Sequence, residues 1–185
     1  MLHLLSTLDK DLFYLVNGHL HGSLLDVFFP YLTKVRHWRV PIAVVWFAVF
    51  MFGGRRGRIV ALLMIPAIAA ADIVNDRVLK TFFDRVRPCN AFGDVRLLIG
   101  CPGSSSFPSG HATNAFSAAT LLASFYGWRI GVPSLLLAGL IGYSRVYVGV
   151  HYPFDVLASA VVGSAWATLV YLAWKRFERR KEVTS

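Results

Sequence analysis

Residues 107–111 read Phe-Pro-Ser-Gly-His and separate a Gly- and Ser-rich loop from an apolar run at 112–128. The central residues 108–110 are typical of a turn that leads into the N-terminus of a helix. Such an end offers unpaired backbone N–H groups and the positive end of the helix dipole, which favour an anion. His111 then stands beside that anion as a proton donor or a ligand. Plain helix capping explains the same letters equally well, so the other charged residues must decide.

The composition is that of a membrane protein with one domain. Of the 185 residues, 56% are hydrophobic and 16% are charged, whereas a soluble domain carries about a quarter charged residues. The length suggests a single domain over residues 1–185. The net charge of +9 does not indicate nucleic-acid binding, because Lys and Arg lie between apolar runs and at the tail, outside any nucleic-acid motif.

Five apolar runs approach the roughly 20 residues that a helix needs to cross a bilayer. They lie at 40–52 (extended from 35), 59–79, 112–128, 130–150 and 154–174. One long polar loop, 81–110, interrupts them, and its charges at Asp84 and Arg85 are interpreted as loop charges. We expect an all-α integral membrane bundle of five to six transmembrane helices, with a charged cytoplasmic tail at 175–185.

Residues 1–34 are predicted to be amphipathic and partly inserted. The apolar positions recur at helical spacing: Leu5, Leu8, Leu12, Leu15 and Val16. The charged run 9–11 faces elsewhere, which favours an amphipathic helix on the membrane surface. A helix packed on the bundle explains the pattern equally well. The apolar run 24–33 is short and contains Pro30, as in a re-entrant or partial span.

Positive charge is distributed unevenly between the two membrane faces. Alternate ends of successive spans lie on one side, so nine cations share a face: Arg55, Arg56, Arg58, Arg129, Lys175, Arg176, Arg179, Arg180 and Lys181. The positive-inside rule makes this face cytoplasmic. The other face carries 80–111 and 144–155 and is predicted to lie outside, although Lys34, Arg36 and Arg39 weaken the bias.

Three polar clusters from different spans fall on the outer face. They are Lys80 with Arg87-Pro88, then Pro108-Ser109-Gly110-His111, and finally Ser144-Arg145 with His151 and Asp155. Each cluster alone has a plain interpretation as a snorkelling anchor, a helix-end charge or a structural pair. Their convergence at one membrane depth favours a functional site.

The residue types in these clusters suit a phosphate group. Lys80, Arg87 and Arg145 give three positive charges, and guanidinium forks match phosphate oxygens. The Ser109 hydroxyl and the Gly110 N–H add donors that can stabilise the extra charge of a phosphoryl transition state. A neutral histidine can attack phosphorus, and a second histidine can protonate the departing oxygen.

The two histidines differ in their neighbours. Asp155 lies four residues after His151, and Pro153 between them suits a first helical turn. The carboxylate can therefore accept from one ring nitrogen and leave the other free to attack, as in a catalytic triad. His111 lacks such a sequence-local carboxylate and takes the acid role.

The combined pattern Lys80-x6-Arg87-Pro88, Pro108-Ser109-Gly110-His111 and Ser144-Arg145-x5-His151-x3-Asp155 resembles the three-part signature of the type-2 phosphatidic acid phosphatase family, which also includes vanadium haloperoxidases. The resemblance is complete at every signature position. It implies a metal-independent phosphatase that needs no cofactor and acts through a phosphohistidine. His151 would be the nucleophile, Asp155 its partner and His111 the general acid. The phosphate-binding residues would be Lys80, Arg87, Ser109, Gly110 and Arg145.

The resemblance to small bacterial members of the family implies a membrane lipid phosphate as substrate. It also implies a multi-pass protein of the bacterial inner membrane, with the active site facing the periplasm or exterior. Candidates are undecaprenyl diphosphate, lipid A 1-phosphate, phosphatidylglycerol phosphate and phosphatidic acid. We favour the first two because both can be met on the outer leaflet.

Two other functions compete with a phosphatase. A non-enzymatic anion-binding or transport protein would use the same basic cluster but would need no nucleophile. A haloperoxidase-like enzyme holding vanadate is disfavoured by the membrane layout. The sequence indicates neither an oligomeric state nor a partner protein.

Cys89 and Cys101 both lie in the predicted external loop. In an oxidising compartment they can form a disulfide, which would hold Arg87 near His111. Two free thiols are the alternative. A metal site is not expected, because the loop between the cysteines lacks His and further Cys.

Overall fold

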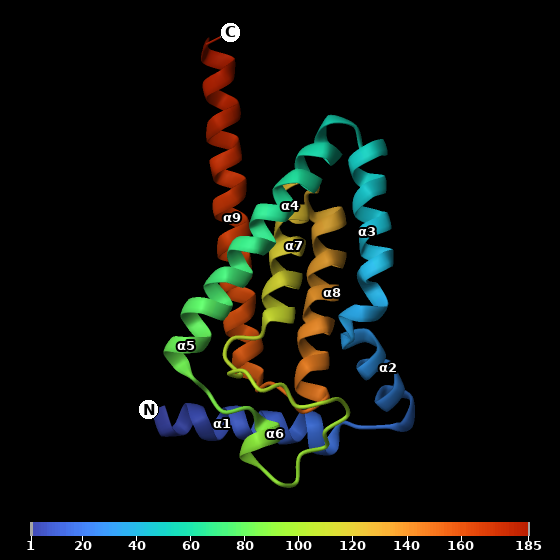
Figure 1. Cartoon of the computed structure of the whole chain (residues 1–185), viewed down its shortest axis with the longest axis vertical. Coiled ribbons are helices and arrows are strands. Elements are labelled where there is room, and N and C mark those ends of the chain that lie inside the picture. Colours follow the sequence, from blue (N-terminus) through green and yellow to red (C-terminus); the bar gives the residue numbers. More distant parts are fainter. Residues whose placement is uncertain (1, 185) are drawn as a thin grey trace.

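The computed structural model describes residues 2–184, and every regular element in this range is a helix (Figure 1). Five long helices run side by side: α3 (Val35–Phe52), α4 (Gly54–Val74), α7 (Gly110–Tyr126), α8 (Trp128–Tyr147) and α9 (Pro153–Thr184). They correspond to the five apolar runs of the sequence, so the predicted all-α bundle is confirmed. The segments of α3, α4, α8 and α9 are long and apolar enough to cross a membrane, and the 17-residue α7 packs between them.

Helix α7 is the centre of the bundle and packs against α4, α8 and α9. Small buried side chains line these contacts: Ala112, Thr113, Ser117, Ala119 and Ala167. A Cβ atom at Gly163 of α9 would overlap the carbonyl oxygen of Thr113. Helices in lipid gain little from the hydrophobic effect and associate through such close backbone approaches. The small residues of α7 and α9 therefore explain why these helices form the core.

The span predicted at 59–79 does not end as a regular α-helix. Helix α4 is followed by a π-helical turn, Asn75–Leu79, and then by α5 (Lys80–Phe83). Single π turns inside helices occur frequently at functional sites. Here the irregular turn immediately precedes Lys80, the first of the predicted phosphate-binding residues.

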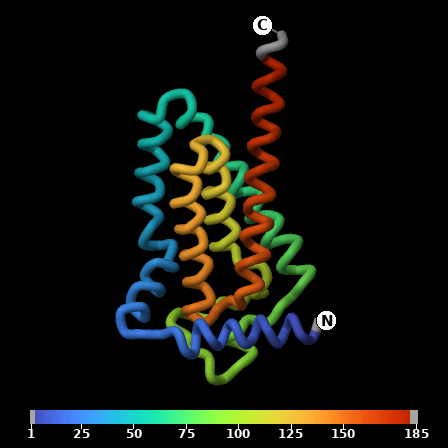
Figure 2. The backbone as a smooth tube through the Cα atoms, turned by 180° about the vertical axis from the view of Figure 1, so that it is seen from behind, coloured from blue at the N-terminus to red at the C-terminus, as the bar shows by residue number. Residues whose placement is uncertain are grey.

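The N-terminal segment forms α1 (Leu2–Tyr14) and α2 (Ser23–Thr33), and α1 lies across the end of the bundle (Figures 1 and 2). The structure shows that one face of α1 packs on the bundle, and its position at the membrane surface stays a prediction. Asp9 and Phe13 are 1% and 0% exposed, whereas Leu4 and Leu8 remain 70% and 46% exposed. One face of α1 thus packs on the bundle, and the apolar face is left for the membrane interface. With 11 residues, α2 is too short to cross and packs on α8.

The two ends of the bundle differ in the way that the charge pattern predicts. The α3–α4 junction, the α7–α8 junction and the C-terminal part of α9 lie at one end (Figure 1). The loop that contains α6 (Pro88–Ala91) and the turn between α8 and α9 lie at the other end, beside α1. Helix α9 continues past the bundle into the charged tail.

Candidate active site

The three polar clusters meet at the end of the bundle beside α1. They come from helix ends: Arg87 precedes α6, Ser109 precedes α7, His111 is in the first turn of α7, Arg145 is in the last turn of α8, and Asp155 is in the first turn of α9. His151 lies in the turn between α8 and α9. Residues fixed at the ends of packed helices hold their geometry better than residues on free loops.

His151 is buried, with 2% of its surface exposed. Its Nδ1 lies 2.7 Å from the carbonyl oxygen of Ser106, which can only accept, so Nδ1 carries the proton. The lone pair of the neutral ring is therefore on Nε2. Nη1 of Arg87 donates to Nε2 over 3.0 Å. The lone pair that could attack a ligand is thus on Nε2, where it accepts the hydrogen bond from Arg87 in this structure.

Asp155 lies next to His151, as the spacing predicts, but it does not make the expected hydrogen bond to the ring. Its Oδ2 is 3.6 Å from Nδ1, beyond hydrogen-bonding distance. This oxygen instead accepts from the Ser106 hydroxyl at 2.7 Å and from the Tyr152 N–H at 2.8 Å. Ser106 therefore contacts both residues, and its carbonyl oxygen orients the histidine.

Arg87 is 4% exposed and is held by main-chain and hydroxyl oxygens. Its Nε donates to Ser104 O at 2.6 Å, and Nη2 donates to the Ser104 hydroxyl at 3.1 Å and to Ser105 O at 3.0 Å. Nη1 also donates to Val150 O at 3.0 Å. These acceptors offset the cost of burying the charge and keep the guanidinium aimed at His151.

Two buried donors in the site have no hydrogen-bond partner among the described residues, the Ser109 hydroxyl and Arg145 Nε. The Ser109 main chain and the Arg145 side chain are nevertheless held in place. The Ser109 N–H donates to the Ser159 hydroxyl at 2.8 Å, and Arg145 Nη1 donates to the Thr33 hydroxyl at 2.6 Å. A buried, unpaired polar group costs about 1–3 kcal/mol. The pair therefore suits a ligand that brings acceptor oxygens, such as a phosphate.

The remaining predicted residues surround this point. His111 is half-buried and lies within electrostatic range of His151 and the site's cations. Lys80 forms a salt bridge with Asp76, whose Oδ1 lies 2.6 Å from the lysine Nζ. Gly110 opens α7, so its N–H belongs to a first turn that lacks intrahelical acceptors. The structure thus brings all eight predicted catalytic and phosphate-binding residues to one end of the bundle.

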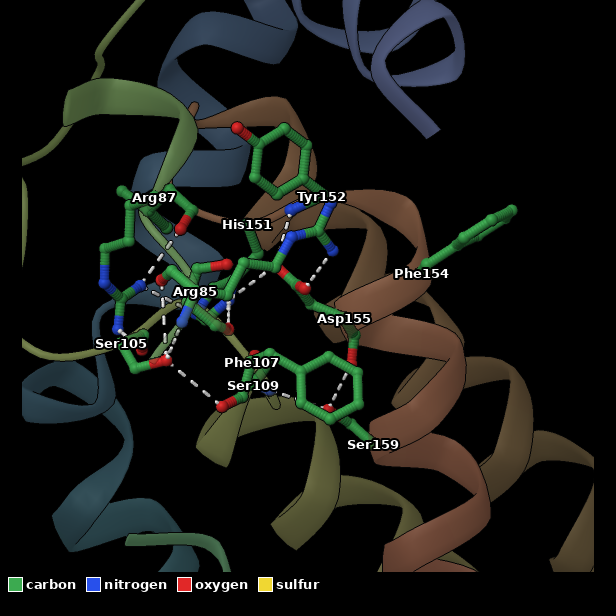
Figure 3. A network of polar contacts seen from close by, with 12 residues as sticks. Arg85, Arg87, Ser105, Phe107, Ser109, His151, Tyr152, Phe154, Asp155 and Ser159 are labelled. Carbon is green, nitrogen blue, oxygen red and sulfur yellow. Dashed lines mark hydrogen bonds and ion pairs between the residues drawn. The ribbon is translucent and has the colours of Figure 1, made fainter. Parts of the chain in front are cut away.

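Arg85, interpreted from the sequence as a loop charge, is part of this network (Figure 3). Its Nη1 donates to Asp155 Oδ1 and its Nη2 to Asp9 Oδ2, both at 2.6 Å. The guanidinium carbon also lies 3.9 Å from the ring centre of Tyr152. One signal was available, because residues two apart in an extended chain face the same side, as Arg85 and Arg87 do. Nothing in the sequence pointed to Asp9.

Burial sets the protonation of the central groups. It lowers the pKa of His151 to about 4, with Asp155 acting in the opposite direction and Arg87 and Arg145 lowering it further. The ring is therefore neutral at pH 7, as a nucleophile must be. Burial also raises the pKa of the Asp9 carboxyl, against the lowering effect of Arg85.

A disulfide joins Cys89 and Cys101, with Cα atoms 6.1 Å apart. Arg87 lies two residues before the first cysteine, and Ser104 lies three residues after the second. The disulfide therefore connects the two chain segments that form the Arg87 site. Among the described side chains, no group of three His, Cys, Asp or Glu residues is placed to hold a metal ion.

Known proteins resemble this chain over most of its length. The family profile described as the PAP2 superfamily matches residues 59–179. The undecaprenyl-diphosphatase BcrC of Bacillus subtilis is 32% identical over 157 residues, which cover 84% of this chain and 78% of the relative. A lipid A 4′-phosphatase of Bacteroides thetaiotaomicron is 30% identical over 183 residues, covering 92% and 79%. The crystal structure of Aquifex aeolicus LpxE matches with a TM-score of 0.75 at 34% identity, over 88% of this chain and 94% of that one.

Proposed function

Because this chain belongs to the PAP2 superfamily and is a membrane lipid phosphatase, we propose that it hydrolyses a lipid phosphate or diphosphate through a phosphohistidine on His151. The observation that carries the proposal is the state of this ring. It is neutral and buried, Nδ1 is held by the Ser106 carbonyl, and Nε2 faces Arg87. The unpaired donors of Ser109 and Arg145 could form hydrogen bonds to phosphate oxygens.

The reaction would proceed in two displacements. In the first, Nε2 of His151 forms a bond to phosphorus while the bond from phosphorus to the lipid oxygen breaks, and His111 gives its proton to that oxygen. In the second, His111, now neutral, takes a proton from water, whose oxygen attacks phosphorus as the N–P bond breaks. Arg87, Arg145 and Lys80 would stabilise the charge on the phosphoryl oxygens in both steps. Neither displacement requires a metal or a cofactor.

We favour undecaprenyl diphosphate as substrate, with a lipid A phosphate second. Three cations and two unpaired donors suit a highly charged headgroup such as a terminal diphosphate. Two of the relatives above are named as phosphatases of these two kinds of lipid. The lipid A relative is named for the 4′-phosphate and not for the 1-phosphate. Phosphatidylglycerol phosphate and phosphatidic acid remain as further arms of the test.

The proposed setting is the bacterial inner membrane, with residues 1–185 acting as one membrane-embedded domain. The distribution of cations supports a cytoplasmic position for the α3–α4 junction and the C-terminal end of α9. The active site would then face the periplasm or exterior. A lipid headgroup on the outer leaflet would reach it without crossing the bilayer.

Phosphate release from the four lipids, in detergent with excess chelator, tests the proposal. We expect release by the wild type and by His3→Ala, which changes an exposed histidine on α1, and none by His151→Ala. A ³²P-labelled diphosphate should label wild-type protein after an alkaline quench, which preserves phosphohistidine, and should not label His151→Ala. Release that depends on added metal, or that persists in His151→Ala, would contradict the mechanism.

A further inference from the structure

Asp9 is an unusual residue to find buried on an amphipathic helix. It is 1% exposed and sits in the middle of α1, while leucines of the same helix face outward. A buried carboxylate is costly unless it is paired and hydrogen-bonded. Both oxygens of Asp9 are used: Oδ2 accepts from Arg85 at 2.6 Å, and Oδ1 accepts from the Phe154 N–H at 2.8 Å. Asp9 therefore joins α1 to the active-site end of the bundle by polar contacts, beside the apolar packing of Phe13 on Val146 and Tyr152.

The partner of Asp9 leads directly to the catalytic network. The second arm of the Arg85 fork donates to Asp155 Oδ1 at 2.6 Å (Figure 3). The main chain of Arg85 also holds the segment that orients the histidine, because the Ser106 N–H donates to Arg85 O at 2.8 Å. Ser106 in turn donates to Asp155 and accepts from His151. Arg85 thus fixes both supports of the histidine, the Asp155 carboxylate and the Ser106 carbonyl.

We propose that Asp9 is a positioning residue for the reaction, which acts through Arg85 on Asp155 and Ser106 and so fixes the orientation of His151. This inference rests on the proposed function, because it assigns Asp9 a role in the histidine-dependent step. Its consequence is that α1 belongs to the catalytic apparatus, although none of the signature residues is on α1. Asp9 touches neither Nε2 nor the unpaired donors of the site, so it should influence turnover and not phosphate binding.

A competing explanation is that the surface beside Asp9 binds the lipid tail. A cavity of about 400 Å³, lined by Leu5, Phe83, Phe107 and Phe154, opens onto Asp9 and Arg85. It lies on the Asp155 side of the network, whereas the attacking Nε2 faces Arg87. Loss of Asp9 would then weaken substrate binding and raise KM. The positioning role predicts a lower kcat at unchanged KM, whereas tail binding predicts a raised KM at unchanged kcat.

Asp9→Asn and Asp11→Asn form a matched pair, because both remove one carboxylate from α1 and Asp11 is exposed. On the lipid that the wild type prefers, we expect Asp9→Asn to lower kcat about tenfold or more, since small displacements of reacting groups have effects of this size. KM should stay within about twofold of the wild type, and Asp11→Asn should match the wild type in both constants. Asp9→Glu, which keeps the carboxylate, should restore part of the lost kcat.

A double variant separates positioning through Arg85 from a general effect on folding. If Asp9 acts only through Arg85, adding Asp9→Asn to Arg85→Gln should cause no further loss of kcat, whereas independent effects would multiply. Should Asp9→Asn not be monodisperse in detergent, Arg85→Lys takes its place. Lysine keeps the charge but lacks the planar fork whose two arms reach Asp155 and Asp9, so the same fall in kcat at unchanged KM is expected.

The outcomes are distinguishable from failure of the proposed function. A wild type without turnover on any lipid would refute the phosphatase mechanism itself. An active wild type with Asp9→Asn equal to Asp11→Asn would overturn the positioning role and leave the mechanism standing. A raised KM at unchanged kcat would also overturn it and would assign the cavity to the lipid tail.

Discussion

At the level of single residues, each buried arginine of the site has hydrogen-bond acceptors that hold it in place. Arg87 donates to main-chain and hydroxyl oxygens, and Arg85 donates to two carboxylates. His151 has one ring nitrogen fixed by a carbonyl oxygen, which leaves the other in a defined state without a direct carboxylate bond. A main-chain atom therefore fixes which ring nitrogen carries the proton, while Arg87 contacts the other nitrogen directly.

The depressed pKa of His151 predicts how stability depends on pH. The unfolded ring titrates near 6.5 and the folded ring at about 4, so between these values the unfolded state binds more protons. The stability that His151 contributes is complete above pH 6.5 and is lost as the pH falls toward 4. From pH 7 to pH 5 the free energy of unfolding should drop by about 2 kcal/mol from this group alone.

Thermal unfolding in detergent at several pH values tests this predicted pH dependence of stability. The Tm of the wild type should fall more between pH 7 and pH 5 than the Tm of His151→Asn, which lacks the titrating ring. His3→Asn is the matched control and should follow the wild type, since that residue is exposed. Parallel curves for wild type and His151→Asn would show that the folded ring titrates at an ordinary pKa.

At the level of elements, the loop between α5 and α7 matters as much as the helices. It supplies Arg85, Arg87 and Ser106, which contact the turn that carries His151, and also the serines at 104 and 105, which hold Arg87. The loop has few regular hydrogen bonds of its own, so its shape depends on these side-chain contacts and on the Cys89–Cys101 disulfide.

Removal of the disulfide is expected to weaken phosphate binding more than catalysis. Closing a loop of this length stabilises a protein by about 3 kcal/mol, and here the loop holds both sides of the Arg87 site. A Cys89→Ser/Cys101→Ser double variant should therefore have a lower Tm and a raised KM, with a smaller change in kcat. A reductant should shift the wild type in the same direction and leave the double variant unchanged. An unaltered KM in both would mean that the Arg87 site keeps its shape without the disulfide.

At the scale of the whole molecule, the two ends of the bundle differ in charge and in function. Cations gather at the end that holds the α3–α4 junction and the C-terminal part of α9, and the site lies at the opposite end (Figure 1). Helix α1 lies across that site end with its leucines exposed, as expected for a helix at the membrane interface. This arrangement supports the proposal that the site opens to the outer leaflet.

Single cysteines placed at the two ends test the orientation. In spheroplasts, a membrane-impermeant maleimide should label Gly93→Cys, in the exposed loop at the site end, without permeabilisation. Arg129→Cys, exposed at the start of α8, should react only after the membrane is opened. Both variants are made in the Cys89→Ser/Cys101→Ser background so that no native thiol reacts. The reverse labelling pattern would place the site in the cytoplasm.

The sequence by itself determined the helical membrane fold, the charge difference between the ends of the bundle and the eight candidate site residues that the structure brings to one end. These features follow from local pattern: apolar runs of spanning length, cations at alternate ends, and short motifs at helix ends. The sequence also correctly predicted that His151 and Asp155 are neighbours, because the tight turn before Pro153 keeps residues four apart close together.

Only the tertiary structure decided which atoms bond. Ser106 bonds to Asp155 through its hydroxyl and to His151 through its carbonyl oxygen, and Arg85 reaches a carboxylate on α1 that is 76 residues away in the sequence. Such contacts depend on how a long loop and a terminal helix pack on the bundle, and no periodicity in the sequence records that packing. For the same physical reason, the leucine pattern of α1 identified its exposed apolar side but could not indicate that its opposite side buries Asp9.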